Sequence, residues 1–320
     1  MNYKQNRRHD VSALPSASLV CLLELLQLLE LLLITDLSFA IEAELRQSLV
    51  YVFSGRIESM NATTNDLNGA LSKVPEVTLG FWIIKIAATT LGETGGDSVT
   101  MTFNWGYLAG TLLFLGFLVV LVIAQILAKK FNPFLYWATI VASTTFGTTM
   151  ADFADRSLGI GYAGGSTLLL VSLLAVLALW HWSEGTISVN TVATPKVECF
   201  YWAAITFSQT LGTALGDWMA DTGLGYEGGA LVFAVGLAIV GALYFWTNIS
   251  RVLVFWAAFI LTRPLGATLG DYLDKPINAG GLNFSRPLAS AIIAAFIVVC
   301  LFIIPQRAGR HPGVSAQAAE

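Results

Sequence analysis

The chain has 320 residues, of which 55% are hydrophobic and only 12% charged, and its formal net charge is −4. This composition differs from that of a soluble domain and predicts a membrane protein. The acidic balance gives no electrostatic footprint for nucleic acid, which excludes that class of partner. The three cysteines and three histidines are scattered. Their spacing predicts neither a metal–thiolate site nor a disulfide framework, and we expect no cofactor.

The first 59 residues differ from everything that follows. The stretch "LLELLQLLELLL" repeats every three residues, a period typical of low-complexity sequence rather than of a helix or a strand. As a spanning helix it would place Glu24 and Glu30 in hydrocarbon, where a charged residue costs about 2.5 to 3.5 kcal/mol. As a signal peptide it would have an apolar core interrupted by acids.

Two interpretations of this first segment therefore stay open. Residues 1–59 are an N-terminal extension that is either unstructured or not translated, because Met60 offers a second possible start. Residues 60–76 are predicted to be a polar N-terminal tail. A native peptide from before Met60, detected by mass spectrometry, would exclude the later start.

Eight apolar segments follow, each near the roughly 20 residues that cross a hydrocarbon core of about 30 Å. They span residues 79–97, 106–127, 133–152, 162–182, 197–220, 228–247, 251–272 and 286–304. We expect an all-α, polytopic membrane protein with one membrane domain, residues 77–305. Residues 306–320 are predicted to be a cytoplasmic tail.

Four of these segments align without a gap: "FWIIKIAATTLGETGGD", "YWATIVASTTFGTTMAD", "YWAAITFSQTLGTALGD" and "FWAAFILTRPLGATLGD". Each has an aromatic–Trp pair, a glycine ten residues after the tryptophan and an aspartate five residues later. These residues are Trp82, Trp137, Trp202 and Trp256; Gly92, Gly147, Gly212 and Gly266; Asp97, Asp152, Asp217 and Asp271. Four gapless matches indicate internal repetition.

The repeated unit contains two helices, since a second apolar segment follows each aspartate after "GYLAG", "GYAGG", "GYEGG" or "NAGG". The units span about 77–128, 129–183, 194–248 and 249–305. An even number of crossings returns the chain to its starting side, which predicts four parallel repeats around a pseudo-symmetric axis along the membrane normal.

Basic residues in the loops predict the orientation. Lys129, Lys130, Lys196 and Arg251 lie between units, whereas the loops within units offer Arg156, Lys275 and Arg286. The tryptophan ends are therefore expected in the cytoplasm and the aspartate ends outside. If translation starts near Met60, both termini are cytoplasmic.

One face of each first helix carries the unusual residues. The glycine and the small residue four positions later form a step that lets helices approach closely. The predicted packing residues are Gly92, Gly96, Gly147, Gly212, Gly216, Gly266 and Gly270. The four tryptophans are predicted to be interfacial anchors.

The aspartates share this face, and ionisable residues inside membranes usually face a bundle interior or a watery cavity. The plainer alternative is a solvated loop, because each aspartate lies about 22 Å along the helix from its tryptophan. Oxygen-rich surroundings without histidine suit hard cations or protons. The candidate ion ligands are Asp97, Asp152, Asp217, Asp271, Glu93, Asp221, Thr144 and Gln209. The pattern does not predict which metal.

Two basic residues break the fourfold pattern. Arg263 is unique to the last unit and Glu93 to the first, and a closed ring would make these units neighbours. We therefore predict an Arg263–Glu93 pair. Lys85 is interpreted as a side chain that reaches the cytoplasmic interface.

Four tandem two-helix units with one tryptophan each resemble a bacterial membrane family known as a repeat of unknown function, whose members are labelled "uncharacterised membrane-anchored protein". The resemblance covers residues 74–305. It implies a location in the bacterial inner membrane and carries no activity with it. The fourth unit departs from the pattern with "TRPLG" and a longer loop.

We expect a transporter or channel-like carrier for a small inorganic cation, either a divalent metal or an ion coupled to protons, and no enzymatic activity. Its partners would be the lipid bilayer and the cation, and its oligomeric state is not predicted. The first alternative is a membrane enzyme that holds Mg²⁺ on a diphosphate lipid through pairs such as Asp217 and Asp221. Against it, the second acid shifts between units and is missing from the first. The second alternative is a non-transporting scaffold.

Overall fold

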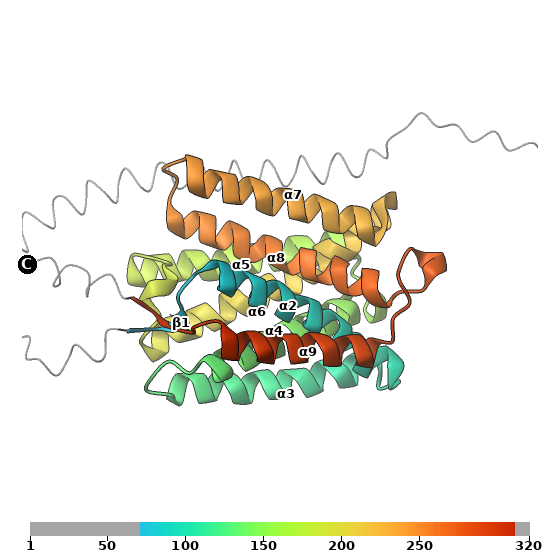
Figure 1. Ribbon diagram of the computed structural model, residues 1–320, viewed down its shortest axis with the longest axis horizontal. Coiled ribbons are helices and arrows are strands. Elements are labelled where there is room, and N and C mark those ends of the chain that lie inside the picture. Colours follow the sequence, from blue (N-terminus) through green and yellow to red (C-terminus); the bar gives the residue numbers. More distant parts are fainter. Residues whose placement is uncertain (1–70, 311–320) are drawn as a thin grey trace, which may run out of the picture. The chain divides into compact units, whose positions relative to one another are not determined.

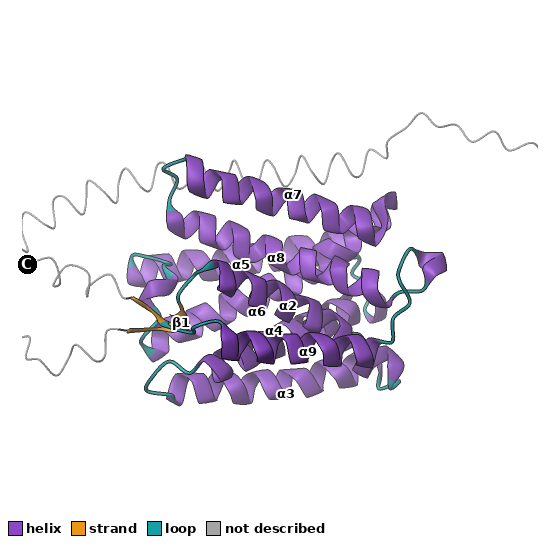
Figure 2. Ribbon diagram, viewed as in Figure 1, coloured by secondary structure: helices purple, strands orange, loops and turns teal. Residues whose placement is uncertain are grey.

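The computed structural model describes residues 71–310, which form α-helices and one two-stranded ribbon (Figures 1 and 2). The α-helices are α2 (Leu79–Asp97), α3 (Gly106–Leu127), α4 (Pro133–Asp152), α5 (Tyr162–Glu184), α6 (Pro195–Met219), α7 (Gly225–Trp246), α8 (Arg251–Asp274) and α9 (Arg286–Ile303). The strands are β1 (Leu71–Pro75) and β2 (Ala308–Arg310). Every helix end lies within three residues of its predicted position. The predicted N-terminal extension lies outside the described residues.

Five helical runs of the described part are long and apolar enough to cross a membrane. They are Gly106–Leu127, Tyr162–Glu184, Pro195–Trp246, Arg251–Asp274 and Arg286–Ile303. The third run joins α6 and α7 through a π-helical turn, η5 (Ala220–Leu224). These helices indicate an all-α membrane protein.

The local sequence explains where the helices begin. Asn132 accepts a hydrogen bond from the backbone N–H of Leu135 and precedes a proline at the start of α4. Thr194 caps α6 in the same way, again before a proline. A polar cap followed by proline satisfies the first free N–H groups of a helix.

The "GY" motifs start the next helices for a different reason. Gly106, Gly161 and Gly225 have φ values of +76°, +77° and +66°. Only glycine adopts this left-handed region without a steric cost. The motif is therefore the turn that reverses the chain after the aspartate in the first three units.

Four helices form a closed inner ring, in which α2 contacts α4, α4 contacts α6, α6 contacts α8 and α8 contacts α2. The other four lie outside this ring. Helix α3 packs on α4, α5 on α6, α7 on α8 and α9 on α2, and Figure 1 shows α7 alongside α8. Each outer helix thus covers the inner helix of the following unit, and the last covers the first.

Glycines set the spacing within the inner ring. Gly92 contacts Thr144 and Gly212 contacts Arg263, and a Cβ on Gly147 would lie 2.9 Å from the backbone nitrogen of Thr210. At each of the four interfaces the ring glycine meets the same region of the following inner helix. Four residues further along, Gly96 meets Thr148 and Gly216 meets Ala267. Contacts that advance together along two neighbouring helices require that the helices run in the same direction.

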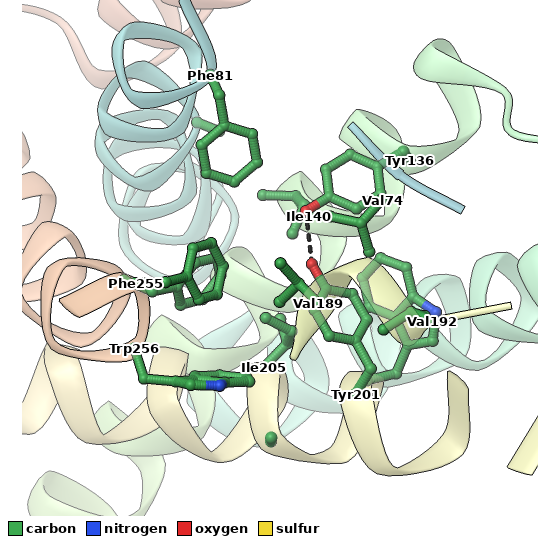
Figure 3. Close-up of a cluster of buried hydrophobic side chains, with 14 of the residues drawn as sticks. Val74, Phe81, Tyr136, Ile140, Val189, Val192, Tyr201, Ile205, Phe255 and Trp256 are labelled. Atoms are coloured by element: carbon green, nitrogen blue, oxygen red, sulfur yellow. Dashed lines mark hydrogen bonds between the residues drawn. The ribbon is translucent and has the colours of Figure 1, made fainter. Parts of the chain in front are cut away.

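An aromatic cluster fills the ring at the tryptophan end. The residues just before the tryptophans are buried, and the hydroxyls of Tyr136 and Tyr201 lie 2.6 Å apart in a hydrogen bond (Figure 3). Trp137, Trp202 and Trp256 are also buried. Three of the four predicted interfacial anchors thus pack inside the protein, and Trp82 is half-buried. An aromatic residue at a helix end fits a packed core as well as an interface.

The ribbon covers the same end. Strands β1 and β2 pair in antiparallel fashion, and the Ser72 hydroxyl donates to the Val189 carbonyl. Lys73 forms an ion pair of 2.6 Å with Glu198 and donates to carbonyls at the end of α3. The sequence predicts only polar tails here. Strands of three and five residues carry too little periodicity to be recognised.

Candidate functional site

The inner helices contribute one residue each to successive layers around the axis. Counting from the tryptophan, the residues three positions on are Lys85, Ile140, Ile205 and Phe259; seven on, Thr89, Thr144, Gln209 and Arg263; eleven on, Glu93, Thr148, Thr213 and Ala267; fifteen on, Asp97, Asp152, Asp217 and Asp271. None of the sixteen exposes more than 6% of its surface. The predicted polar face is therefore the interior of the ring.

Arg263 joins all four units at one point. Its Nη1 and Nη2 atoms each lie 3.1 Å from Glu93 Oε2, and Nη2 also donates to the hydroxyls of Thr148 and Thr213. These three acceptors occupy the same repeat position in the three other units. The pair predicted between Arg263 and Glu93 is present. The two threonines were not predicted as its partners.

The guanidinium also closes the axis. Arg263 is fully buried, and it lies between the aspartate layer and the aromatic cluster. A buried ion pair depends on hydrogen bonds to its remaining polar atoms. Here hydroxyls from two further helices bind Nη2, whereas Nε has no hydrogen-bond partner among the described residues. The axis is thus filled at this level rather than lined by an open file of oxygens.

Two basic residues clamp the aspartate layer in pairs. Arg156 lies 2.7 Å from Asp152 and 3.8 Å from Asp217. Lys275 lies 2.8 Å from Asp271 and 2.7 Å from Asp97. Each basic residue follows its own aspartate by four positions and reaches the aspartate of the following unit. Within residues 71–310, no basic side chain bridges the other two neighbouring pairs of this layer.

Only the second and fourth units carry a clamping basic residue, so the aspartate layer has twofold rather than fourfold symmetry. At the position of Arg156 and Lys275, the first and third units carry Met101 and Asp221 instead. The sequence pattern predicts only that both basic residues lie in loops. A basic residue four positions after an acid on a helix is a signal that would have found them.

The charge of Lys275 follows from its surroundings. Burial alone lowers the pKa of this amine, but the carboxylates of Asp271, Asp97 and Asp274 raise it further than burial lowers it. The net result is a pKa well above the ordinary value of a lysine. Lys275 is therefore an ammonium at neutral pH.

Among the described residues, two groups of three carboxylates have the spacing of metal ligands. Glu93, Asp217 and Asp271 each offer an oxygen within 4.8 Å of the others, and all three are buried. Asp97, Asp271 and Asp274 form the second group. Asp271 belongs to both. Carboxylate oxygens at this spacing suit a hard cation.

The ion pairs around the aspartate end leave an excess of negative charge. The groups that they join are Glu93, Asp97, Asp152, Asp217, Asp271 and Asp274 on the acidic side, and Arg156, Arg263, Lys275 and Arg286 on the basic side. Six carboxylates against four basic groups give a formal excess of two negative charges. One divalent cation or two protons would neutralise it.

Four predicted ligands belong to neither group, and one of them is Asp152, which pairs with Arg156. Asp221 is exposed and belongs to neither group of carboxylates. Thr144 and Gln209 are buried in the layer next to that of Glu93, on the side of the tryptophan end. The Thr144 hydroxyl and both polar atoms of the Gln209 amide have no hydrogen-bond partner among the described residues.

Lys85 lies deeper in the ring than expected. It is fully buried, and its Nζ atom lies 3.9 Å from the centre of the Phe259 ring. The interpretation of Lys85 as an interfacial side chain is therefore wrong.

An inner ring with a charged interior, enclosed by apolar outer helices, defines a polytopic helical membrane protein built from tandem units. A family model described as "Repeat of Unknown Function (DUF347)" matches residues 80–131, 135–186, 200–250 and 254–305. The chain belongs to this family, and the resemblance seen in the sequence is confirmed. No curated protein and no solved structure matches the chain.

Proposed function

We propose that the protein is a membrane carrier for a small inorganic cation, and that Glu93, Asp217 and Asp271 are its ligands. The observation that supports this proposal best is a group of three buried carboxylates within an end of the ring whose ion pairs leave a formal excess of two negative charges. Buried charges are stable only when they are compensated. A divalent cation or two protons would provide the compensation.

We further propose that all eight α-helices cross the bacterial inner membrane as four parallel units. The common direction of the inner helices supports this topology, as do the two paired strands that bring both ends of the described chain to one side. The basic residues between units favour a cytoplasmic tryptophan end. The aspartate end then faces outward.

Access to the site differs between the two ends. The Arg156 side chain in the aspartate clamp is 39% exposed, whereas Tyr136 and Tyr201 in the aromatic cluster are fully buried. This difference supports entry of the ion from the aspartate end, which is covered less thickly than the tryptophan end. Carriers expose a fixed site to each side in turn, so transport requires Arg263 to move from the axis.

The enzyme alternative has less support. A diphosphate substrate would need free basic groups, but Lys275 and Arg286 both pair with aspartates of the site. The second acid of the D-x-x-x-D pair, Asp221, is exposed. A non-transporting scaffold would not explain why buried acidic residues recur at the same position of every unit.

The experiment is a flux assay in liposomes. The full chain is reconstituted, and the movement of H⁺, Na⁺, K⁺, Mg²⁺, Ca²⁺ and Mn²⁺ is measured beside protein-free liposomes. We expect flux of at least one ion, and its loss in Asp217→Asn. No flux for any ion, or flux indifferent to neutralisation of all four aspartates of the layer, would remove the carrier hypothesis.

A further inference from the structure

We propose that Lys275 is a tethered cation that occupies a second ion site, formed by Asp97, Asp271 and Asp274. Withdrawal of its side chain would then admit an ion from solution to that site. The inference rests on the proposed function, because it concerns the occupancy of carboxylates next to the proposed transport site. It adds a second site and the residue that controls it.

The first argument is geometric. The Lys275 ammonium lies 2.7 Å from Asp97 and 2.8 Å from Asp271, the position in which a cation would bridge the two carboxylates. Asp274 completes a group whose oxygens lie within 4.8 Å of one another. Asp97 Oδ1, in a residue that is 1% exposed, has no hydrogen-bond partner within the described part of the chain. Arg286 approaches the outer part of the group, at 3.7 Å from Asp97 and 3.4 Å from Asp274. The Lys275 ammonium, at less than 3 Å from two of the carboxylates, therefore takes the place that a free ion would take.

The second argument concerns the loop that holds Lys275. The longer loop of the fourth unit folds back on the end of α8, where the Asn283 N–H donates to the Lys275 carbonyl at 2.9 Å. The Phe284 N–H donates to the Leu273 carbonyl at 2.9 Å. Gly281 packs so closely on the Lys275 backbone that a Cβ would overlap it. The backbone of Lys275 is thus fixed, and its flexible side chain is the part that can withdraw.

The third argument is the sharing of Asp271. This carboxylate belongs to the proposed transport site and also pairs with Lys275. An ion at the transport site would attract the Asp271 carboxylate and so weaken its ion pair with Lys275. Occupancy of one site therefore favours release of Lys275 from the other.

The second clamp provides a matched control. Arg156 bridges Asp152 and Asp217 as Lys275 bridges Asp271 and Asp97. No group of three carboxylates within residues 71–310 includes Asp152. Removing Arg156 therefore breaks a similar clamp without opening a second ion site.

The test measures how many Mn²⁺ ions the purified full chain binds in detergent, from the signal of free Mn²⁺ in electron paramagnetic resonance. We expect one ion for the wild type and for Arg156→Gln, and two for Lys275→Gln. Lys275→Gln combined with Asp97→Asn should return to one ion. Lys275→Met replaces the glutamine variant if that variant does not fold.

The outcomes separate the two proposals. Equal numbers of ions for the wild type and both Lys275 variants would overturn the second site and leave the transport site in place. An extra ion in Arg156→Gln as well would also overturn it, since the gain would then come from lost positive charge alone. No ion for the wild type and one for Lys275→Gln would support the second site while counting against a divalent ion at Glu93, Asp217 and Asp271.

Discussion

Arg263 on α8 donates two hydrogen bonds of 3.1 Å to the Glu93 carboxylate on α2, and both residues are buried in the centre of the ring. This pair closes the ring between the last unit and the first. The same guanidinium reaches hydroxyls on α4 and α6. The charged pair is therefore the point at which all four units are held in register.

The first prediction concerns this pair. Arg263→Met leaves the Glu93 carboxylate buried without its partner, and we expect a loss of about 3 to 5 kcal/mol in the free energy of unfolding. Glu93→Gln should cost a similar amount. The double variant should be more stable than the sum of the two losses predicts, because it leaves neither charge unpaired. Unfolding in detergent measures all three, and additive losses would contradict the pairing.

The second prediction concerns the glycine spacing. A Cβ on Gly266 would overlap the Thr89 hydroxyl of the neighbouring inner helix. We expect Gly266→Ala to lower the free energy of unfolding by about 1 to 3 kcal/mol, as overpacking does in cores. Gly116 on α3 has no atom within 4 Å of such a Cβ. Gly116→Ala should therefore have little effect, and equal losses in the two variants would refute a close inner ring.

The third prediction concerns the tyrosine pair at the tryptophan end. Tyr136→Phe removes one partner of a buried 2.6 Å hydrogen bond and leaves the Tyr201 hydroxyl unsatisfied. This should cost about 1 to 3 kcal/mol of stability. The double change to phenylalanine should recover most of the loss because no hydroxyl remains. Thermal unfolding of the single and double variants provides the comparison, and a double variant as unstable as the summed singles would argue against the bond.

The sequence predicts the helices and the charged interior well, and the reason is periodicity. The constant spacing from Trp82 to Gly92 to Asp97, repeated four times, places the glycines and aspartates on one face of each helix. Parallel helices with such a face can bury it only against one another. Ring closure and the Arg263–Glu93 pair follow from the same spacing.

Other features carry no comparable signal. The outer helices are apolar on most of their surface, so nothing in α9 indicates that it packs on α2 rather than on its own partner in the unit. Trp137 shows the same ambiguity, since an indole at a helix end fits a membrane interface and a core equally well. The spacing of four residues indicates the contact of Lys275 with Asp271, but its contact with Asp97 of another unit depends on how the helices pack.

The central claim is that Glu93, Asp217 and Asp271 bind the transported cation. Its most direct test is the initial flux in liposomes of Asp217→Asn beside Asp221→Asn, at equal amounts of folded protein and with the ion that the wild type moves fastest. Both variants lose one negative charge in the same unit, but Asp217 is buried in the group of three carboxylates and Asp221 is exposed. The account predicts at least a tenfold loss for Asp217→Asn, on the order of 1.4 kcal/mol, and near wild-type flux for Asp221→Asn. Equal flux in the two variants would contradict it.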